Sequence, residues 1–256
     1  MIYDGQLADK IAIITGAAGG IGAATAHAMA DAGAKVVLVD VDVVHLEELV
    51  ADITKGGGTA VAVGGDVSDE ETVADIVARV QARFGGVDIL FNNAGIIHRS
   101  TAVELAMETW DRVMRVNVQS VFLMCKYVIP IMAASGGGSI INTGSGWGLK
   151  GGAKALSYCA SKGAVVNMTR ALAIDHGPDG IRVNSINPGD VDTAMLRTEA
   201  EQLGEDESDF LAHAADRPLH RVGRPEEIGD VVVWLASDAS SYVTGSAVIA
   251  DGGGIA

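Results

Sequence analysis

A glycine-rich turn near the start of the chain constrains the fold more than any other feature. Residues 10–15 (KIAIIT) have the apolar, β-branched composition of a buried strand, and the turn TGAAGGIG at residues 15–22 follows directly. An alanine-rich helical pattern then runs to Ala32. A strand, a glycine turn and a helix in this order aim backbone N–H groups and a helix N-terminus at a diphosphate. The pattern also occurs as a plain tight turn between packed elements, so the turn alone leaves both interpretations open.

The second expected strand favours the nucleotide interpretation. Residues 35–39 (KVVLV) lead to Asp40, whose carboxylate stands about 20 residues after the turn and can accept hydrogen bonds from both ribose hydroxyls of an adenosine. The same charge would repel a 2′-phosphate. Neither the turn nor the positions directly after Asp40 hold a Lys or Arg that could bind one. The sequence therefore predicts a site for NAD rather than NADP.

Strand and helix patterns alternate along the rest of the chain, without an internal repeat, a linker or a low-complexity segment. Such alternation predicts an α/β fold in which a doubly wound parallel sheet carries helices on both faces. Ligands of these sheets bind outside the carboxyl ends of the strands. Further strands are expected at residues 59–63, 87–91, 139–143, 181–186 and 247–250, and helices at 70–83, 110–133, 155–176 and 226–237. The residues that would gather at the carboxyl edge are Gly22, Asp40, Asn93, Ser145 and Pro188.

A tyrosine and a lysine share one of these helices. Tyr158 and Lys162 are four residues apart, so they would lie on the same helix face. An ammonium there would lower the phenol pKa from about 10 toward neutrality and make Tyr158 a general acid and base for an alcohol oxygen. Ser145 ends the preceding strand region and supplies a hydroxyl that could hold the same oxygen. Without further context, a lysine stem packed on a tyrosine ring is the commoner reason for such a pair.

Other polar positions have both structural and functional interpretations. Asn93, in the turn NNAG at residues 92–95, can tie neighbouring strands together or contact a cofactor. Asn117 lies inside an expected helix, where asparagine is mildly unfavourable and can bend the helix by bonding to backbone carbonyls. Asp66 and Val67 follow the third strand, where the edge of an adenine could be met.

Composition limits the location and the partners of the chain. The formal net charge of −15 over 256 residues would repel the phosphates of nucleic acids. Cys125 and Cys159 are too few for a disulfide framework. Apolar runs are interrupted before they reach a membrane-spanning length, and the first residues lack the pattern of a signal peptide. We expect a cytoplasmic protein with no nucleic-acid partner, no membrane and no metal.

Two segments depart from the average charge. Residues 190–216 hold nine carboxylates and one basic residue, Arg197, which suits either a solvated pair of amphipathic helices or a mobile lid over the site. Residues 93–165 hold seven Lys or Arg against three carboxylates. Among them, Arg99 and Lys150 follow the fourth and fifth strands, where they could attract a polar or anionic substrate such as a sugar, polyol or hydroxy acid. Loop lysines are more often simply solvated.

Together, these motifs resemble the short-chain dehydrogenase/reductase (SDR) family, and the match runs almost from end to end. One departure is Gly144, where many family members carry a second serine, but Ser145 keeps its place thirteen residues before Tyr158. The shared positions are Gly16, Gly20, Ile21 and Gly22; Asn92, Asn93, Ala94 and Gly95; Asn117, Ser145, Tyr158 and Lys162; Pro188, Gly189 and Thr193; and Thr244, Gly245, Asp251, Gly252 and Gly253.

The resemblance implies a single Rossmann-like domain over residues 1–256, with a seven-stranded sheet, a substrate lid at about 190–216 and commonly a homotetramer. It implies an NAD-dependent enzyme that interconverts a secondary alcohol and a ketone, with Asn117, Ser145, Tyr158 and Lys162 as the catalytic set and a water held by Asn117 as a proton relay. The implied NAD contacts are Gly16, Gly20, Ile21, Gly22, Asp40, Asp66, Val67, Asn93, Ala94, Gly95, Tyr158, Lys162, Pro188, Gly189, Val191 and Thr193.

Two alternatives remain open at this point. Within the enzymes, the chain could be a 3-oxoacyl or steroid-type ketone reductase. Outside them, it could be a regulatory protein that senses NAD without turnover, although the intact set of Ser145, Tyr158 and Lys162 speaks against this interpretation.

Overall fold

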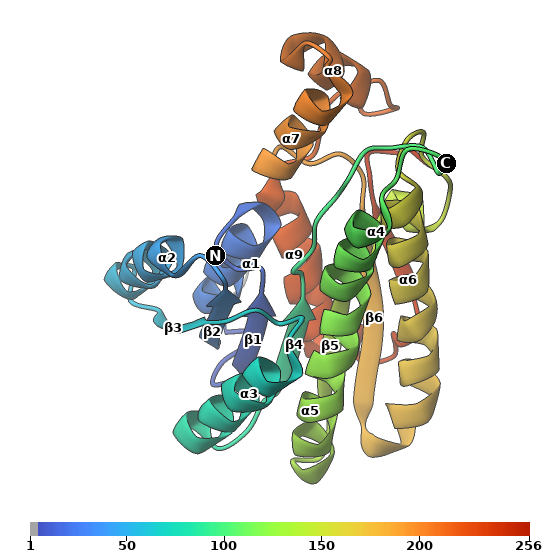
Figure 1. The fold of residues 1–256 in the computed structure, drawn as a ribbon. Helices are drawn as coiled ribbons and strands as arrows, with labels where there is room; N and C mark the ends of the chain where they lie inside the picture. Colours follow the sequence, from blue (N-terminus) through green and yellow to red (C-terminus); the bar gives the residue numbers. More distant parts are fainter. Residues whose placement is uncertain (1–4) are drawn as a thin grey trace.

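The protein is built on a seven-stranded parallel sheet with the strand order β3-β2-β1-β4-β5-β6-β7 (Figure 1). The computed structural model describes residues 5–256. Each neighbouring pair of strands is parallel. The strands are β1 Ile11–Thr15, β2 Lys35–Asp40, β3 Thr59–Gly64, β4 Ile89–Asn92, β5 Gly138–Thr143, β6 Ile181–Pro188 and β7 Ala247–Ala250. The predicted α/β class and doubly wound sheet are therefore confirmed.

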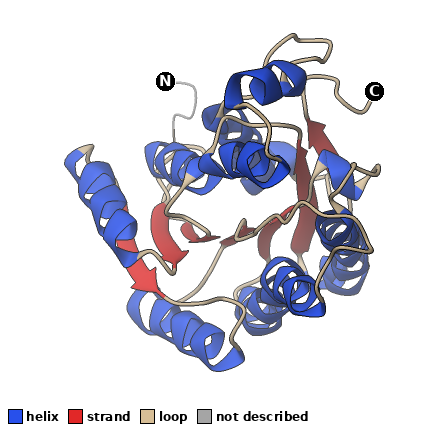
Figure 2. Ribbon diagram, turned by 45° about the horizontal axis from the view of Figure 1, so that its top comes forward, coloured by secondary structure: helices blue, strands red, loops and turns tan. Residues whose placement is uncertain are grey.

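Helices cover both faces of the sheet (Figure 2), and the strand sequences explain why. Successive strand residues point to opposite faces, so in β1 Ile14 packs in one hydrophobic layer and Ile13 in the other, both fully buried. Strands buried on both sides are apolar throughout, which suits a parallel sheet. The first layer contains α1 Gly20–Asp31, α2 Val43–Lys55 and α9 Pro225–Ala236, and the second contains α3 Glu70–Phe84, α5 Ser120–Ala134 and α6 Leu156–His176.

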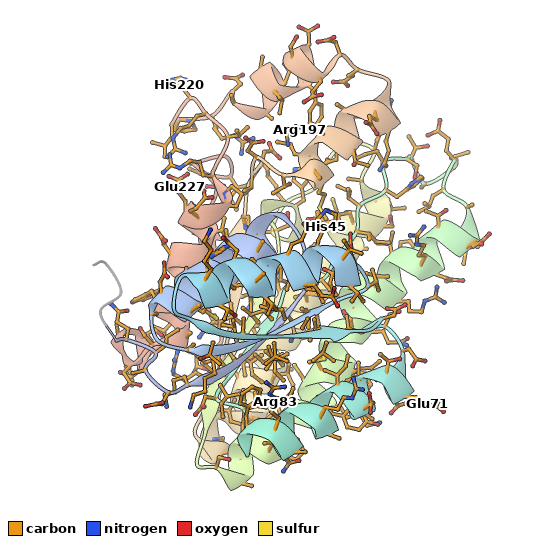
Figure 3. All side chains as sticks on the ribbon, turned by 90° about the vertical axis from the view of Figure 1, so that its left-hand side faces the viewer. His45, Glu71, Arg83, Arg197, His220 and Glu227 are labelled. Carbon is orange, nitrogen blue, oxygen red and sulfur yellow. The ribbon has the colours of Figure 1, made fainter. Side chains whose placement is uncertain are left out.

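Helix α2 was not among the predicted elements. Its buried residues are Leu46, Leu49 and Ile53, whose spacing places them on one helix face. Asp42 caps the helix by accepting a hydrogen bond from the His45 amide at 3.2 Å. Charged side chains of the helices, such as Glu71 and Arg83, lie on the outside of the molecule (Figure 3).

The long helix expected at residues 110–133 is divided. Helix α4 Met107–Met114 is followed by a π-helical turn at Arg115–Gln119 and then by α5. The turn contains Asn117, which is fully buried. A π-helical turn inserts an extra residue into the helix and often marks a functional position. The irregularity predicted from Asn117 is therefore present, but the side chain bonds to a different segment rather than to its own helix.

The combined helical stretch Met107–Ala134 is 28 residues long and apolar enough to pass a length-and-composition test for a membrane span. Half of its most apolar window is buried inside the protein. That burial is typical of a core helix in the protein interior.

Residues 190–216 form a pair of helices, as one of the two interpretations predicted. Helix α7 Ala194–Leu203 and helix α8 Glu207–Ala214 lie at the top of Figure 1. Thr193 caps α7 through the Leu196 amide at 3.4 Å, and Asp206 caps α8 through the Ser208 amide at 2.9 Å. The pair is joined to the rest of the fold where Val191 pairs with Gly223 in an isolated β-bridge.

Candidate active site

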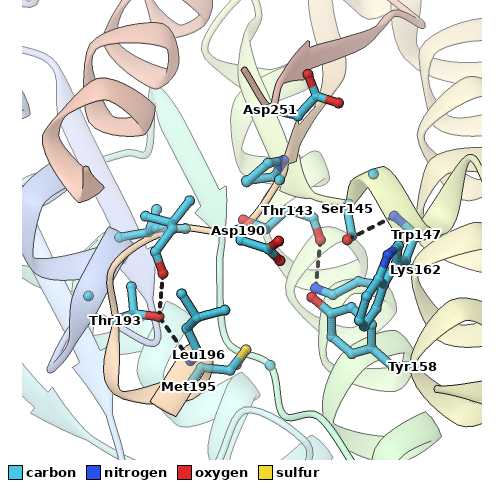
Figure 4. A pocket seen from close by; sticks show the side chains of 18 of the residues that line it. Thr143, Ser145, Trp147, Tyr158, Lys162, Asp190, Thr193, Met195, Leu196 and Asp251 are labelled. Atoms are coloured by element: carbon cyan, nitrogen blue, oxygen red, sulfur yellow. Dashed lines mark hydrogen bonds between the residues drawn. The ribbon is translucent and has the colours of Figure 1, made fainter. Parts of the chain in front are cut away.

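A cavity of about 360 Å³ lies where the loops after β1, β4, β5 and β6 meet, with α7 forming one wall (Figure 4). This is the carboxyl edge of the sheet, beside the point between β1 and β4 where the strand order reverses, the usual ligand site of such folds. The predicted site residues that line it are Gly16, Gly20, Ile21, Asp40, Asn93, Ala94, Gly95, Ser145, Tyr158, Lys162, Pro188, Gly189, Val191 and Thr193.

Four predicted residues lie outside the cavity lining. Asp66 is exposed and holds the Ser68 amide at 2.9 Å, and Val67 is 6% exposed in the core. Gly22 and Asn117 are buried in the scaffold beneath the cavity. The roles predicted for these four residues in binding NAD or in catalysis therefore stay predictions.

The glycine turn needs glycine for steric reasons. Gly20 has φ +49, in the left-handed region, and a Cβ there would lie 2.8 Å from Thr193 Cγ2. A Cβ on Gly22 would lie 2.0 Å from the Gly16 carbonyl oxygen. Helix α1 begins at this turn without a side-chain cap, so its first N–H groups are left for another acceptor.

Asn93 and Thr15 join the turn to the neighbouring strand. The Asn93 side-chain amide donates to the Gly16 carbonyl at 3.0 Å. Thr15 Oγ1 accepts from the backbone amides of Asn93 at 3.0 Å and Ala94 at 3.1 Å. Asn93 therefore has the predicted structural role and also lines the cavity.

Asp40 ends β2 and lines the same cavity. The Ala18 amide donates to Oδ2 at 3.0 Å, and the Asp42 amide donates to Oδ1 at 3.1 Å. These two bonds hold the carboxylate beside the glycine turn, where its remaining lone pairs can accept hydroxyl protons.

Ser145, Tyr158 and Lys162 meet at the other end of the cavity (Figure 4). Lys162 Nζ donates to the Thr143 carbonyl at 2.8 Å and lies 5.7 Å from the Tyr158 ring centroid. Ser145 Oγ accepts from the Trp147 amide at 3.1 Å, while the Ser145 amide donates to Asn187 Oδ1 at 3.2 Å. Bonds from β5 and β6 therefore set the position of the serine and the lysine.

The environment shifts the pKa values of both groups on α6. Burial raises the pKa of the Tyr158 phenol, and the Ser145 side chain offsets part of that rise. Burial lowers the pKa of Lys162 to about 8. The expected fall of the phenol pKa toward neutrality is thus wrong for this structure, because removal from water disfavours both the tyrosinate and the ammonium. Lys162 remains largely charged at neutral pH.

Asn117 connects the cavity floor to α6. Its Oδ1 accepts from the Ile96 amide at 2.8 Å, and its Nδ2 donates to the Ile96 carbonyl at 2.9 Å and to Ser161 Oγ at 3.0 Å. Ser161 in turn donates to the Tyr158 carbonyl at 2.8 Å. Sequence reasoning missed Ser161, although its spacing of three residues from Tyr158 places it on a nearby helix face.

Arg99 lies outside the cavity lining and offers it no free positive charge, which disfavours the possibility that it contacts substrate directly. Its side chain is 8% exposed and its Nη1 donates to Glu199 Oε2 at 2.6 Å. Lys150 does line the cavity, but its Nζ donates to the Gly254 carbonyl at 2.6 Å. The sequence did not indicate Glu199 or Gly254 as site residues, because each meets its partner about 100 positions away.

Comparison with known proteins places these motifs in a family. A family model described as enoyl-(acyl carrier protein) reductase matches residues 16–254. An uncharacterized oxidoreductase, YxbG of Bacillus subtilis strain 168, is 43% identical over 97% of this chain and 92% of its own length. The chain belongs to the short-chain dehydrogenase/reductase family. It is an SDR oxidoreductase that acts on CH–OH groups and interconverts alcohols and ketones.

Other SDR proteins of known activity or structure are similar over their whole length. Cyclohexanol dehydrogenase of Acinetobacter sp. strain SE19 is 37% identical, covering 98% of this chain and 97% of the relative. NAD-dependent glycerol dehydrogenase of Listeria innocua serovar 6a is 37% identical, covering 98% of this chain and 95% of the relative. The crystal structure of levodione reductase superposes with a TM-score of 0.94 at 36% identity, covering 96% and 97%. The crystal structure of a short-chain type dehydrogenase/reductase from Mycobacterium marinum superposes with a TM-score of 0.90 at 36% identity, covering 98% of each chain.

Proposed function

We propose that this protein is an NAD-dependent dehydrogenase of secondary alcohols that acts on a polar hydroxy compound such as a sugar or polyol. The observation that carries the proposal is the single cavity that joins Asp40 and the glycine turn to Ser145, Tyr158 and Lys162. A nucleotide held at one end would bring its reactive part to the acid, base and hydroxyl groups at the other.

The residues at the first end fit NAD. The uncapped start of α1 offers N–H donors for a diphosphate, and Asp40 offers carboxylate acceptors for the two adenosine ribose hydroxyls. A 2′-phosphate would meet the negative charge of Asp40 in place of a hydroxyl donor. NAD⁺ would supply the hydride acceptor when an alcohol is oxidised, and NADH the hydride donor when a ketone is reduced.

The residues at the second end fit proton transfer. We assign Tyr158 as the group that takes the hydroxyl proton of the alcohol while hydride leaves the carbinol carbon, and that returns a proton in the reverse reaction. Ser145 donates a hydrogen bond to the same oxygen and stabilises the charge that develops on it. Lys162 contributes a positive charge that favours the tyrosinate and could also contact the nicotinamide ribose.

Asn117 completes the proposed catalytic set by position. Through Ile96 and Ser161 it holds the loop after β4 against the helix that carries Tyr158. A water bound near Asn117 could relay protons between Lys162 and solvent.

The substrate preference rests on the cavity and on related enzymes. With Arg99 paired to Glu199, the substrate end of the cavity offers less free positive charge than the sequence suggested, which favours a neutral hydroxylated compound over an anion. Related dehydrogenases are named for the neutral alcohols cyclohexanol and glycerol, and one is named for an anionic hydroxy acid, cis-4-hydroxycyclohexanecarboxylate.

We further propose that residues 1–256 act as one dinucleotide-binding domain and that residues 190–216 form its substrate lid. Met195, Leu196 and Glu199 of α7 line the cavity, so opening of this segment would admit substrate. A cytoplasmic location without nucleic-acid or membrane partners fits the net charge of −15.

A homotetramer is the assembly that we propose. Phe122 on α5 and Ile174 on α6 are 52% and 76% exposed, and Trp234 on α9 and Ile249 on β7 are 38% and 48% exposed. The family resemblance implies interfaces on the two longest helices and the C-terminal strand region, so we expect them on α5, α6 and β7. Light scattering coupled to gel filtration would give the mass in solution.

An activity screen tests the function. Purified protein would be offered sugars, polyols, cyclic alcohols and 3-oxoacyl thioesters, with NAD(H) and with NADP(H), and NADH or NADPH would be followed by absorbance. NAD-linked oxidation of polyols supports the proposal. Preference for an acyl ketone would favour the 3-oxoacyl or steroid-type reductase alternative. Tight NAD binding without turnover of any substrate would favour the sensor alternative.

A further inference from the structure

A buried acid stands at the substrate end of the cavity. Glu199 lines the cavity although its side chain is only 8% exposed. Arg99, equally buried, donates from Nη1 to Glu199 Oε2 at 2.6 Å. Gln202, one turn further along α7, accepts from the Arg99 amide at 2.7 Å. Arg99 therefore holds the Glu199 carboxylate directly, and the bond to Gln202 is a second contact between α7 and the loop after β4.

The same arginine connects Glu199 to the proposed proton-transfer group. The Arg99 guanidinium lies 4.9 Å from the Trp147 ring centroid and donates from Nη2 to the Ala153 carbonyl at 3.0 Å. The Trp147 ring meets the Tyr158 ring edge-on, with 6.2 Å between centroids, and the two rings lie side by side in Figure 4. This continuous packing fixes the location of Glu199 relative to the alcohol oxygen that Tyr158 would bind.

Glu199 is more deeply buried than the other two acids of the substrate end, Asp190 and Asp251. Asp190 is paired with Arg217. Asp251 accepts from the amides of Gly253 and Ile255, both at 2.8 Å, with one bond to each carboxylate oxygen. An ionised carboxylate can accept about four hydrogen bonds, and Arg99 takes one position on Oε2 of Glu199. Lone pairs of Glu199 therefore remain for a donor that enters the cavity.

We propose that Glu199 forms a subsite for a second hydroxyl of the substrate, on a carbon other than the one that is oxidised. The carboxylate accepts a hydrogen bond from that hydroxyl, and Arg99 positions it. Above about pH 7, where Glu199 is ionised, the carboxylate accepts hydrogen bonds and cannot donate one, so it selects alcohols over ethers or ketones at this point and repels anionic groups. The ligand class is a neutral diol or polyol. This inference rests on the proposed dehydrogenase function.

The strength of such a bond sets the expected effect. A hydrogen bond to a charged partner contributes about 1.5–3 kcal/mol, which corresponds to about 10- to 100-fold in affinity or in kcat/KM. Because water competes with the substrate hydroxyl for the same carboxylate, we expect an effect at the lower end of this range. We therefore expect at least one diol to exceed its matched mono-alcohol about tenfold in kcat/KM.

Matched substrates test the subsite directly. Cyclohexanol would be compared with the cis and trans isomers of its diols, and 2-butanol with 2,3-butanediol, in NAD-linked oxidation at a pH above 7, where Glu199 is ionised. In Glu199→Gln the ratio of diol to mono-alcohol should fall about tenfold, because the charge is lost. Glu201→Gln, on the exposed side of the same helix, is the control and should keep the wild-type ratio. Equal ratios in wild type and Glu199→Gln would overturn the proposal.

A second variant guards against misfolding. Glu199→Gln leaves a buried guanidinium without its charged partner, so Arg99→Met with Glu199→Leu removes the whole pair and replaces it with apolar volume. Circular dichroism and NADH binding would establish that the double variant is folded. It should then show no diol preference, and a preserved preference would overturn the proposal even if the single variant failed to fold.

A binding measurement separates this inference from the proposed function. The complex with NADH would be titrated with each alcohol, and NADH fluorescence would report the dissociation constant without turnover. If wild type binds diols about tenfold more tightly than mono-alcohols and Glu199→Gln does not, the subsite stands even if no alcohol is oxidised. If alcohols are oxidised but neither readout distinguishes diols, the dehydrogenase function stands and the subsite is wrong.

Discussion

Arg99 Nη1 and Glu199 Oε2 lie 2.6 Å apart, although 100 positions separate the two residues in the chain and each side chain is only 8% exposed. The pair joins the loop after β4 to α7 and closes one side of the cavity. Burial raises the pKa of Glu199 to about 7, and Arg99 opposes that rise. A buried charge pair of this kind is weak evidence for stability, but the loss of one partner is damaging.

Arg99→Met should therefore destabilise the protein by about 3 kcal/mol, because it leaves a buried carboxylate without its cation. The loss should be smaller below about pH 7, where Glu199 is neutralised by a proton. Denaturant unfolding followed by circular dichroism measures the effect. Arg197→Met is the matched control, because Arg197 pairs with Asp192 and Glu207 at the surface. This substitution should lower the free energy of unfolding by about 1 kcal/mol or less. Similar losses in the two variants would contradict the expectation.

The cofactor preference should reside in Asp40. We expect NADH to bind at least about 100-fold more tightly than NADPH, since a 2′-phosphate would lose hydrogen bonds to a carboxylate and face its charge. Asp40→Ser should weaken the binding of NADH and strengthen the binding of NADPH. Fluorescence titration with both nucleotides provides the test, and comparable affinities in the unmodified protein would rule out this role for Asp40.

Tyr158→Phe should abolish turnover while NADH binding stays close to that of wild type. General acid–base help contributes about 10²–10⁴-fold, so residual activity should stay below about one per cent. Lys162→Ala should impair both turnover and NADH binding, because the ammonium is proposed to act on the phenol and on the ribose. Substantial activity in Tyr158→Phe would place the proton transfer elsewhere.

Lys162 should make stability depend on pH in a defined direction. Its pKa falls from 10.5 to about 8 on folding, so below about pH 8 burial of its charge costs on the order of 3 kcal/mol. Between about pH 8 and pH 10 the unfolded chain holds the extra proton, and stability rises with pH. The melting temperature of wild type relative to Lys162→Met should therefore increase from about pH 7 to about pH 9.5. A constant difference would show that Lys162 keeps an ordinary pKa.

Two glycines of the same turn should respond differently to alanine. Gly22→Ala would place a Cβ 2.0 Å from the Gly16 carbonyl oxygen, whereas nothing lies within 4 Å of a Cβ on Gly19. We expect Gly22→Ala to lower the free energy of unfolding by about 3 kcal/mol or more, because the backbone must move. Gly19→Ala should lower it by about 1 kcal/mol or less. Thermal unfolding of both variants compares them, and equal stability would contradict the close packing of the turn.

Local patterns predicted much of this fold. The apolar runs, the glycine turn and the spacing of Tyr158 and Lys162 are short-range features, and the strands found for them lie within a few residues of those expected. Helix α2 was not predicted, although Leu46, Leu49 and Ile53 lie on one face of it. The π-helical turn at Asn117 could not be predicted, because it depends on Ile96 and Ser161, which reach that side chain only in the folded chain.

The sequence by itself determined the class of the sheet, the nucleotide end of the cavity and the family, because each depends on residues close together in the chain. Only the tertiary structure decided the electrostatics of the substrate end. Burial raised the pKa of Tyr158, lowered that of Lys162, and matched Arg99 with Glu199 rather than with a ligand. The pKa shifts depend on how deeply each side chain is buried away from water. The pairing of Arg99 with Glu199 depends on folding that brings together residues about 100 positions apart. Neither the depth of burial nor the identity of a distant ion-pair partner can be read from the local sequence.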